Sequence, residues 1–459
     1  MKYFLLISIT FLITSCSSDD SGNVYVGDIY LTSPEEIEEF GANNYTKIEG
    51  KLVIDDAENA NQITTLQPLE SITNINGGLW ITAPFLESLY GLENLTSIGG
   101  TLRITDCNNL INLNGLNHLT HIYNDLYLNN NESLTGINGL ESLSFIESIY
   151  VSNNSSLINL DGLENITNTG ENGRLTIENN TSLISLSGLN NLSNINGVVT
   201  IRNNASLTGL TGLESLTSTG SGIYLANNPN IYDLSGLENL TSIGGVFVIS
   251  NNSSLTNLLG LESLTSINHG LEISNNNSLV NLAGLQNFSI ELGLKIRNNP
   301  LLSSLSNLQI TTLGGSLSIR NNPSLTSLSG LGNISNNGSS IEIISNSSLT
   351  SLTGLENVSS VHRIQIINNS NLLTLLGLQN LSTTSSLFIK DNTSLTGLSS
   401  LENLSSVDQD FYISNNTTLV DFCSLQQDLI INILYDNYTV TENGYNPTIQ
   451  DLLDGDCSL

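Results

Sequence analysis

The sequence repeats one short phrase at intervals of about 24 residues along almost its whole length. Each copy contains a Gly-Leu step, two further apolar residues, a short apolar strand and an Asn-Asn pair. One copy begins at Gly236, passes through a strand at 247–249 and ends with Asn251-Asn252. A fixed period of this length is typical of solenoids, in which each turn stacks on the one before it. The repeat therefore constrains the architecture more strongly than composition does.

The energetics of one turn show why the turns must stack. Four or five buried Leu, Ile or Val side chains contribute on the order of 10 kcal/mol at about 2 kcal/mol each, while ordering the backbone costs about 1 to 2 kcal/mol per residue. One turn alone cannot fold, so its stability comes from its neighbours, and both ends need caps. We therefore expect a mainly β fold, a right-handed solenoid of about sixteen stacked turns of about 24 residues with short helical caps. The glycine of the step is Gly91, Gly115, Gly139, Gly162, Gly188, Gly212, Gly236, Gly260, Gly284, Gly330, Gly354 and Gly377, and its place is taken by Pro68, Asn307, Ser400 and Ser424 in the other turns.

The first residues have the pattern of an export signal. Met1-Lys2 gives a positive start, and the apolar core at 3–13 is too short to span a bilayer. Residues 13–16, Ile-Thr-Ser-Cys, resemble the bacterial lipobox, in which the signal is cut before the cysteine and the cysteine is acylated. An ordinary signal peptide with Cys16 near the cleavage site is the alternative. Because no later segment has the apolar length of a membrane helix, lipid on Cys16 is the only membrane anchor that we expect.

The acidic stretch after Cys16, residues 17–20, resembles the surface-export signal of lipoproteins in the Bacteroidetes group, although acidic stretches are also ordinary in tethers. The resemblance implies a lipid-anchored protein of the outer membrane, exposed at the cell surface; a lipoprotein facing the periplasm is the alternative. The expected organisation is a signal peptide at 1–15, an acidic flexible tether at 16–28, an N-terminal cap at 29–50, the repeat solenoid at 51–430 and a C-terminal cap at 431–459.

The charge balance excludes one class of partner. Lys and Arg number 11 against 42 Asp and Glu, which gives a formal net charge of −31. Such a molecule repels nucleic acid and anionic membrane surfaces, so we expect no nucleic-acid partner. Charged residues are only 12% of the chain, as expected for stacked turns whose corners are uncharged polar residues.

The second residue of the Asn-Asn pair forms a column when the turns are superimposed. An amide both donates and accepts hydrogen bonds, whereas a carboxylate only accepts, so identical Asn side chains can bond up and down a stack. We interpret this column as structural. Its members are Asn131, Asn154, Asn180, Asn204, Asn228, Asn252, Asn276, Asn299, Asn322, Asn346, Asn369, Asn392 and Asn416.

Both ends of the repeat carry helix signals. Residues 33–36 form a capping box with Pro at the first helical position, and Gly41 follows as a stop signal, which predicts a short helix over the first turn. Residues 446–448, Asn-Pro-Thr, open a second short helix that Gly455 closes. These two helices are the expected caps.

Three cysteines follow Cys16. Cys107 lies about thirteen turns from Cys423, which is about 60 Å at roughly 4.8 Å per turn and far beyond disulfide reach. Cys423 and Cys457 should therefore pair and attach the C-terminal cap to the last turn. Cys107, which lies in the Asn column, is then a buried free thiol, with intermolecular pairing as the alternative.

The pattern Leu-x-x-Leu-x-x-Ile-Gly-Gly-x-Leu-x-Ile-x-Asn-Asn, preceded by the segment 45–54, resembles the receptor L-domain family. That family contains the ligand-binding solenoid modules of insulin- and growth-factor-receptor ectodomains, with relatives among fungal wall proteins and bacterial surface lipoproteins. The resemblance covers roughly residues 45–425 and implies the fold. The chain departs from the receptor modules in its many more turns and its near lack of disulfides, so a receptor role does not follow. The second family is the bacterial leucine-rich repeat of the BspA surface type, which has a period near 23 and is linked to adhesion.

The positions that vary from turn to turn are the ones that can carry function. In the Leu-x-Ile strand the middle residue points away from the core, because side chains alternate along a strand. Four consecutive turns place there Trp80, Arg103, Tyr127 and Tyr150. Aromatic residues with Arg anchor protein interfaces and present stacking surfaces, although aromatics favour the outer face of strands in any case. These four residues are the candidate ligand face, and Phe388 and Tyr412 are a weaker second candidate.

A second column is acidic and follows the Gly-Leu step. Neighbouring carboxylates repel, and a bound cation would relieve that repulsion. However, Asn117, Asn190, Gln286 and Gln379 interrupt the row, and the Asp-rich loop spacing of calcium sites is absent. We therefore interpret the column as a solvated edge and expect no metal. Its members are Glu70, Glu93, Glu141, Glu164, Glu214, Glu238, Glu262, Glu356 and Glu402.

The residue types that catalysis requires do not converge in the sequence. Solenoid enzymes that cleave polysaccharides need carboxylates, often with basic residues, on two or three adjacent turns. Arg297 and Arg320 are the nearest basic pair, and Asn and Pro rather than acids flank them. The histidines show no metal spacing; they are His118, His121, His269 and His362.

The sequence thus predicts a non-enzymatic cell-surface lipoprotein without cofactor or metal. We expect it to act as a monomeric binding or adhesion scaffold for an extracellular protein or glycan. A passive structural spacer or coat protein is the alternative function, and a polysaccharide-degrading solenoid enzyme is the third.

Overall fold

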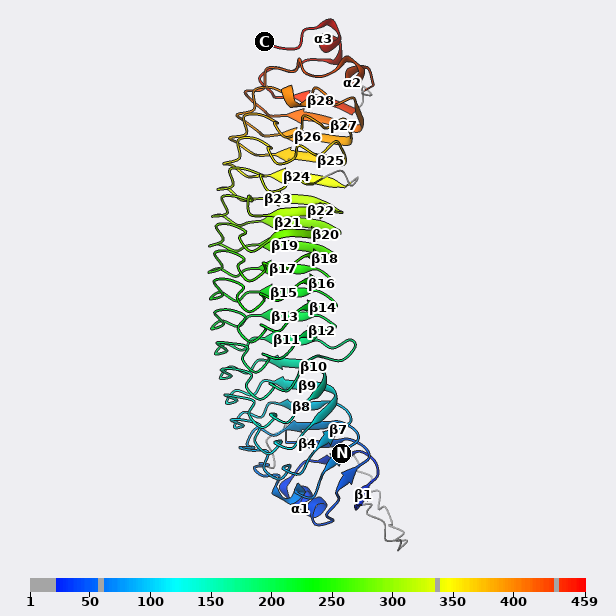
Figure 1. The fold of residues 1–459 in the computed structure, drawn as a ribbon, viewed down its shortest axis with the longest axis vertical. Coiled ribbons are helices and arrows are strands. Elements are labelled where there is room, and N and C mark those ends of the chain that lie inside the picture. Colours follow the sequence, from blue (N-terminus) through cyan, green and yellow to red (C-terminus); the bar gives the residue numbers. More distant parts are fainter. Residues whose placement is uncertain (1–21, 57–61, 335–338, 433–436) are drawn as a thin grey trace, which may run out of the picture.

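The computed structural model describes residues 22–56, 62–334, 339–432 and 437–459. They form one long, gently bowed column of stacked turns, with the two ends of the chain at opposite ends of the column (Figure 1). Strands lie along one side of the column and loops along the other. The predicted signal peptide at 1–15 and the predicted lipid site Cys16 lie outside the described residues.

One strand from each turn joins a continuous parallel ladder, which we call the main ladder. Successive turns pair residue for residue, as in Ile223↔Phe247 and Phe247↔Leu271. In order along the stack, the strands are β2 (Ile29–Leu31), β4 (Leu52–Asp55), β6 (Leu79–Thr82), β8 (Leu102–Thr105), β9 (His121–Asn129), β10 (Phe145–Ser152), β11 (Leu175–Glu178), β13 (Val199–Arg202), β15 (Ile223–Ala226), β17 (Phe247–Ser250), β19 (Gly270–Ser274), β21 (Gly293–Arg297), β23 (Leu317–Arg320), β24 (Ser340–Ile344), β25 (Ser360–Ile367), β26 (Thr383–Lys390), β27 (Ser406–Ser414) and β28 (Tyr438–Thr441).

A second set of parallel strands, the side ladder, precedes the main ladder in each turn. At β9, β10, β25, β26 and β27 the chain runs through both ladders as one long strand, so the N-terminal halves of these strands belong to the side ladder. Its other strands are β1 (Val24–Tyr25), β3 (Lys47–Ile48), β5 (Asn74–Ile75), β7 (Ser97–Ile98), β12 (Asn194–Ile195), β14 (Ser218–Thr219), β16 (Ser242–Ile243), β18 (Ser266–Ile267), β20 (Gln286–Ile290) and β22 (Gln309–Leu313).

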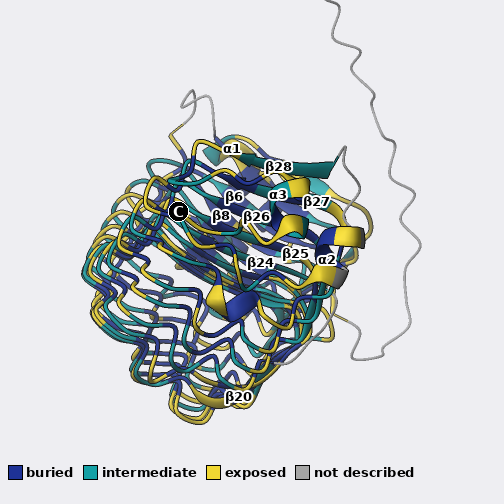
Figure 2. Ribbon diagram, turned by 90° about the horizontal axis from the view of Figure 1, so that it is seen from above, coloured by how far each residue is buried: buried dark blue, intermediate teal, exposed yellow. Residues whose placement is uncertain are grey.

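The core is a single apolar column enclosed by the turns. Alternate strand residues point inward, and the leucines of the loops point toward them; Figure 2 shows buried residues on the inside of the superimposed turns. In one turn the inward residues are Leu237, Leu240, Ile243, Phe247, Ile249 and Leu255, each at most 2% exposed. This arrangement confirms the predicted mainly β solenoid. In the described residues, no helix is both long enough and apolar enough for a bilayer crossing.

In most turns the Gly-Leu step marks a corner whose backbone conformation favours glycine. Gly236 has φ of 105°, a conformation that side chains disfavour. A Cβ built there would lie 2.2 Å from the carbonyl oxygen of Leu210 in the preceding turn. Where Pro68 and Ser400 replace the glycine, a short 3-10 helix forms the corner instead, η1 (Gln67–Leu69) and η2 (Ser399–Leu401).

The two residues of each Asn-Asn pair have different roles. The first takes the left-handed backbone conformation, with φ of 57° at Asn251, which Asn tolerates better than most residues. The second, such as Asn252, is 0% exposed, and this holds for every member of the predicted column. We call the buried column the Asn spine.

The hydrogen bonds of Asn252 explain why Asn recurs at this position in successive turns. Its Oδ1 accepts a hydrogen bond from the backbone N–H of Asn228 at 3.0 Å, and its Nδ2 donates to the carbonyl of Leu225 at 3.0 Å. Both partners belong to the preceding turn. Direct bonds between neighbouring amides are longer, for example 3.3 Å from Asn204 Nδ2 to Asn228 Oδ1. The predicted stack of amides is therefore held mainly by side chain to backbone bonds.

Cys107 takes the place of Asn near the start of the spine. Its N–H donates to Asn131 Oδ1 at 3.0 Å, and its Sγ accepts from the N–H of Ala83 at 3.4 Å. The thiol is free and buried, as predicted. Burial raises the pKa of the Cys107 thiol to about 12, so the thiol is protonated and unreactive at neutral pH.

Both predicted helices are present. At the N-terminal end, α1 (Pro34–Gly41) begins after Ser33, whose hydroxyl accepts from the N–H of Glu36, and buries Ile37 and Phe40 against the first turn. At the other end, α3 (Ile449–Asp454) has a capping box formed by Thr448 and Asp451 and ends at a left-handed Gly455. A further helix, α2 (Gln427–Asn432), was not predicted.

The stack extends further at both ends than the sequence predicts. β1 lies within the predicted tether at 16–28, β2 within the predicted N-terminal cap, and β28 within the predicted C-terminal cap. These strands lack the Gly-Leu step by which the turns are recognised. The Cys423–Cys457 disulfide joins the last turn to the segment after α3, as the sequence predicts.

The Asn spine can be tested with two substitutions in one turn. Asn252→Gly removes the partners of a buried N–H and a buried C=O, so we expect the free energy of unfolding to fall by about 2 to 6 kcal/mol, at about 1 to 3 kcal/mol per unsatisfied group. Asn251→Gly, at a left-handed position, should change it by less than about 0.5 kcal/mol. Urea denaturation followed by circular dichroism measures both. Equal effects at the two positions would contradict the assigned roles.

Candidate ligand-binding surface

The main ladder brings the four predicted ligand-face residues together. Trp80 pairs in register with Arg103, Arg103 with Tyr127, and Tyr127 with Tyr150, across β6, β8, β9 and β10. Arg103 is exposed, and the three aromatic side chains are half-buried. We call these four residues the aromatic row. The four residues come together because side chains alternate along each strand and the strands pair in register. That they bind a ligand stays a prediction.

Contacts within the row hold its side chains in place. The guanidinium carbon of Arg103 lies 5.1 Å from the ring centroid of Tyr127, and the rings of Tyr127 and Tyr150 are 5.8 Å apart. At the end of the row, Lys51 Nζ lies 4.8 Å from the centroid of Trp80. Cation–π and aromatic contacts of this kind reduce the freedom of the side chains before a ligand arrives. A surface ordered in advance loses less entropy on binding.

A second aromatic cluster, which the sequence analysis missed, lies on the side-ladder halves of β9 and β10. His121 stacks on Tyr123 at 5.7 Å and on Phe145 at 6.2 Å between ring centroids, and Tyr123 is 5.7 Å from Phe145. Tyr123 is 54% exposed and Phe145 38%. A signal was available, because these turns, like those of β25 to β27, have no glycine where the two ladders join. The strands continue through the corner and carry aromatics on both sides of it.

Asp125 lies between the two aromatic groups on β9 and pairs in register with Ser148. Burial raises the pKa of the Asp125 carboxyl, a hydrogen bond with Ser148 lowers it, and the nearby carboxylate of Glu147 raises it. The net pKa is above the ordinary value. The corner therefore combines exposed rings with hydrogen-bonding carboxyl groups, a mixture suited to binding polar ligands with apolar faces.

The weaker second candidate also forms a contact pair. Phe388 and Tyr412 pair in register on β26 and β27, with their rings 5.9 Å apart. Arg363 lies 4.9 Å from the Phe388 ring centroid. This pair repeats the chemistry of the aromatic row on a smaller scale at the other end of the stack.

The acidic column has a structural role that the sequence analysis did not identify. The carboxylate of Glu238 accepts from the N–H of Gly236 at 3.0 and 2.9 Å. The same bond recurs at Glu93, Glu141, Glu164, Glu214, Glu262 and Glu356. Where the acid is absent, Asn117, Asn190 and Gln379 accept the same bond. These amides therefore continue the column rather than interrupt it, because the Gly corner needs an acceptor and not a charge.

Asn and Pro rather than acids flank Arg297 and Arg320 in the sequence, yet both arginines have an acidic partner in the structure. Arg297 forms an ion pair with Glu272 at 2.6 Å, and Arg320 with Glu342 at 2.7 Å. The partners lie in neighbouring turns, so the flanking sequence does not reveal them. Both are two-residue ion pairs on the outer face, and no cluster of three His, Cys, Asp or Glu able to hold a metal occurs in the part of the chain that the structure describes.

Comparison with known proteins adds little to this geometry. No family model matches the chain, and no curated protein matches it. Among solved structures the chain is similar to the "Crystal structure of TLR13-ssRNA13 complex", with 17% sequence identity, 78% of this chain and 71% of that chain covered, and a TM-score of 0.18. At that score the likeness carries no argument. The leucine-rich-repeat-like fold rests on the repeat and the two parallel ladders, and the resemblance to receptor L-domains stays a prediction.

The role of the acidic column can be tested at Glu238. Glu238→Gln keeps an acceptor for the Gly236 N–H, so we expect the free energy of unfolding to change by less than about 0.5 kcal/mol. Glu238→Ala removes the acceptor and should cost about 1 to 2 kcal/mol. Urea denaturation with and without calcium chloride measures both. A calcium-dependent gain in stability that Glu238→Gln abolishes would show instead that the column is a cation site.

Proposed function

We propose that this protein is a non-enzymatic binding scaffold that engages an extracellular protein or glycan through the aromatic row. The observation that supports the proposal is the register of Trp80, Arg103, Tyr127 and Tyr150, which form one contiguous surface on four consecutive strands. Residues of these types dominate the energetics of interfaces. The rigid ladders beneath hold the backbone of the row fixed.

We further propose that the protein is a surface lipoprotein anchored through Cys16. The strand β1 begins at Val24, eight residues after Cys16, a span of at most about 29 Å when fully extended. With lipid on Cys16, the column would project from the membrane by its N-terminal end. The aromatic row and the cluster on β9 and β10 would then lie in the membrane-proximal part of the column, while the disulfide-linked cap would lie at the distal end.

The ligand proposal can be tested by probing glycan and protein arrays with the soluble chain that begins at Ser17. For any ligand found, the Trp80→Ala, Tyr127→Ala, Tyr150→Ala triple variant should bind at least about 30-fold more weakly, since a single hot-spot residue contributes about 2 kcal/mol or more. The Phe388→Ala, Tyr412→Ala variant is the matched control and should bind normally. Full binding by a folded triple variant would refute the assignment of the row. Failure to bind any protein or glycan would favour the spacer function.

The anchoring proposal can be tested by replacing Cys16 with Ser. We expect the wild-type protein in the membrane fraction and the Cys16→Ser variant in the soluble fraction, because the variant has no thiol at the position that would be acylated. Protease treatment of intact cells should digest the wild-type protein if it faces outward. A Cys16→Ser variant that stays with membranes would contradict the lipid anchor, and protection from protease in intact cells would indicate a periplasmic orientation.

A further inference from the structure

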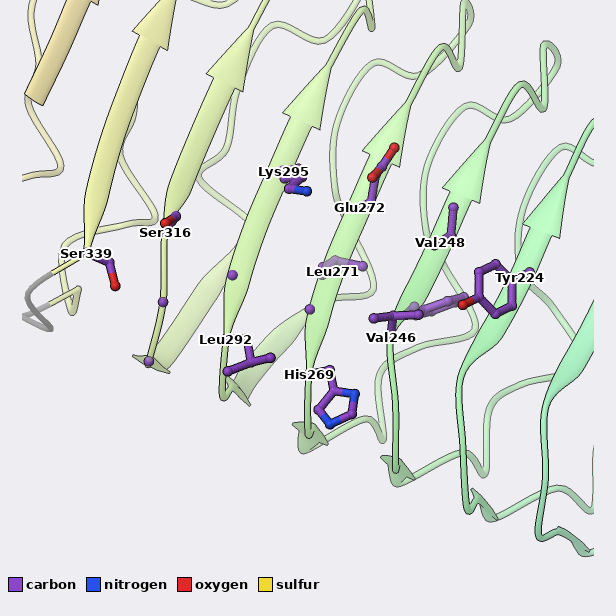
Figure 3. A pocket seen from close by; sticks show the side chains of 15 residues that line it. Tyr224, Val246, Val248, His269, Leu271, Glu272, Leu292, Lys295, Ser316 and Ser339 are labelled. Carbon is purple, nitrogen blue, oxygen red and sulfur yellow. The ribbon is translucent and has the colours of Figure 1, made fainter. Parts of the chain in front are cut away.

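A groove runs along the outer face of the main ladder between β15 and β24 (Figure 3). Its volume is about 530 Å³. Tyr224, Val248 and Lys295 stand along one side, and His269 and Leu292 stand at the corner on the other side. The strands β11 and β13 separate β15 from β10 in the ladder, so the groove is a surface distinct from the aromatic row.

The groove exists because one outward-facing position is glycine in two neighbouring strands. The residue just before the first core residue of the strand is Gly270 in β19 and Gly293 in β21, which pair in register. The same position is Arg174 before β11 and Arg363 in β25, and the guanidinium of Arg363 lies over the Phe388 ring. The floor is therefore bare peptide backbone. Its polar groups are paired within the ladder, as in the bond from the N–H of Leu294 to the carbonyl of Ser316 at 2.9 Å.

Lys295 is an unusual cation in this chain. Ten of the eleven Lys and Arg residues lie in the described ranges; five of them form ion pairs with carboxylates and three lie over aromatic rings. In these ranges Lys295 and Arg174 are the two cations with neither an ion-pair partner nor an aromatic ring beneath them. Glu272, which pairs in register with Lys295, is held by Arg297 at 2.6 Å. Lys295 thus presents a positive charge at the rim of the groove without a carboxylate partner.

We propose that this groove binds a glycan chain that contains a carboxylate-bearing sugar, a uronic acid residue. The sugar rings lie along the glycine floor, with their apolar faces against Tyr224, Val248 and Leu292, and the carboxylate meets Lys295 Nζ. An apolar groove with a few polar groups that fix orientation is the usual form of a small-ligand site. A charge-assisted bond at the rim supplies specificity.

The chemistry of the floor favours a glycan over a peptide. An extended peptide needs partners for its backbone N–H and C=O groups, and it finds them by adding to a free sheet edge. Here each strand is already paired on both sides. A sugar ring instead presents C–H faces to the floor and keeps its hydroxyls for water, Ser316 and His269 at the rim.

The net charge of the protein also limits how densely charged the glycan can be. A net charge of −31 repels a dense polyanion over distances of about the Debye length, roughly 8 to 10 Å at physiological salt. A chain with one carboxylate among neutral sugars has little of this repulsion and still satisfies Lys295. The expected ligand is therefore a sparsely charged glycan.

The experiment uses the full chain and isothermal titration with a tetrasaccharide that contains one glucuronic acid residue, beside the matched neutral tetrasaccharide. We expect Lys295→Met to weaken binding of the acidic sugar about tenfold or more, to the level of the neutral sugar. Arg174→Met is the matched control, because it removes the other unpartnered cation from the same ladder, and it should bind normally. Gly270→Leu should abolish binding of both sugars by filling the groove.

Several results would overturn the proposal. They are no binding of the acidic sugar at millimolar concentration, equal loss in Lys295→Met and Arg174→Met, and unchanged binding in a folded Gly270→Leu variant. Tighter binding of a tetraglutamate peptide than of the acidic sugar would reassign the groove to peptides. The triple variant of the aromatic row should bind the acidic sugar normally, so failure of one site is distinguishable from failure of the other.

Discussion

Each buried Asn of the spine bonds to the backbone of the preceding turn, and these bonds hold the turns in register. Where the chain leaves a main-ladder strand along the spine, one backbone N–H and one backbone C=O form their hydrogen bonds with a side chain of the following turn. The amide of Asn252 satisfies one such pair, from Asn228 and Leu225. Because a buried polar group without a partner is costly, the spine fixes the spacing of the turns. It also requires the left-handed residue before it, which explains why Asn occurs in pairs.

Register between turns follows from this constraint, and the surface follows from register. When turns align residue for residue, every outward position becomes a row along the stack, and the core residues beneath it hardly change. The aromatic row and the glycine floor occupy two adjacent outward positions of the same ladder in different turns. Substitutions at these positions alter what the surface displays while the inward residues and the spine maintain the fold. A single repeated framework can therefore present several separate surfaces along its length.

The period, the core, the buried Asn column, both cap helices and the Cys423–Cys457 pairing were predictable from sequence, because each depends on local spacing or on elimination. The aromatic row was predictable for the same reason. The features that were missed depend on neighbours one turn away or on missing side chains. The ion pair of Arg297 with Glu272 spans two turns, and the groove is defined by the absence of a side chain at Gly270 and Gly293. The role of Glu238 was missed because it requires knowing that Gly236 has a free N–H at its corner.

The excess of acid raises the question of how a stack can hold a column of carboxylates one turn apart. Neighbouring carboxylates of the column repel one another modestly. The repulsion energy is about 1 kcal/mol for unit charges 4 Å apart in water and is smaller with salt. The hydrogen bond to the glycine N–H is of similar size, so the column is close to balanced, and Asn or Gln can replace Glu without loss of the bond. The acid is therefore not needed for the fold. Carboxylates or rings engage eight of the ten Lys and Arg residues in the described ranges. An unpaired cation on the outer face is therefore an exception in this acidic surface, and a positive point of contact for a ligand.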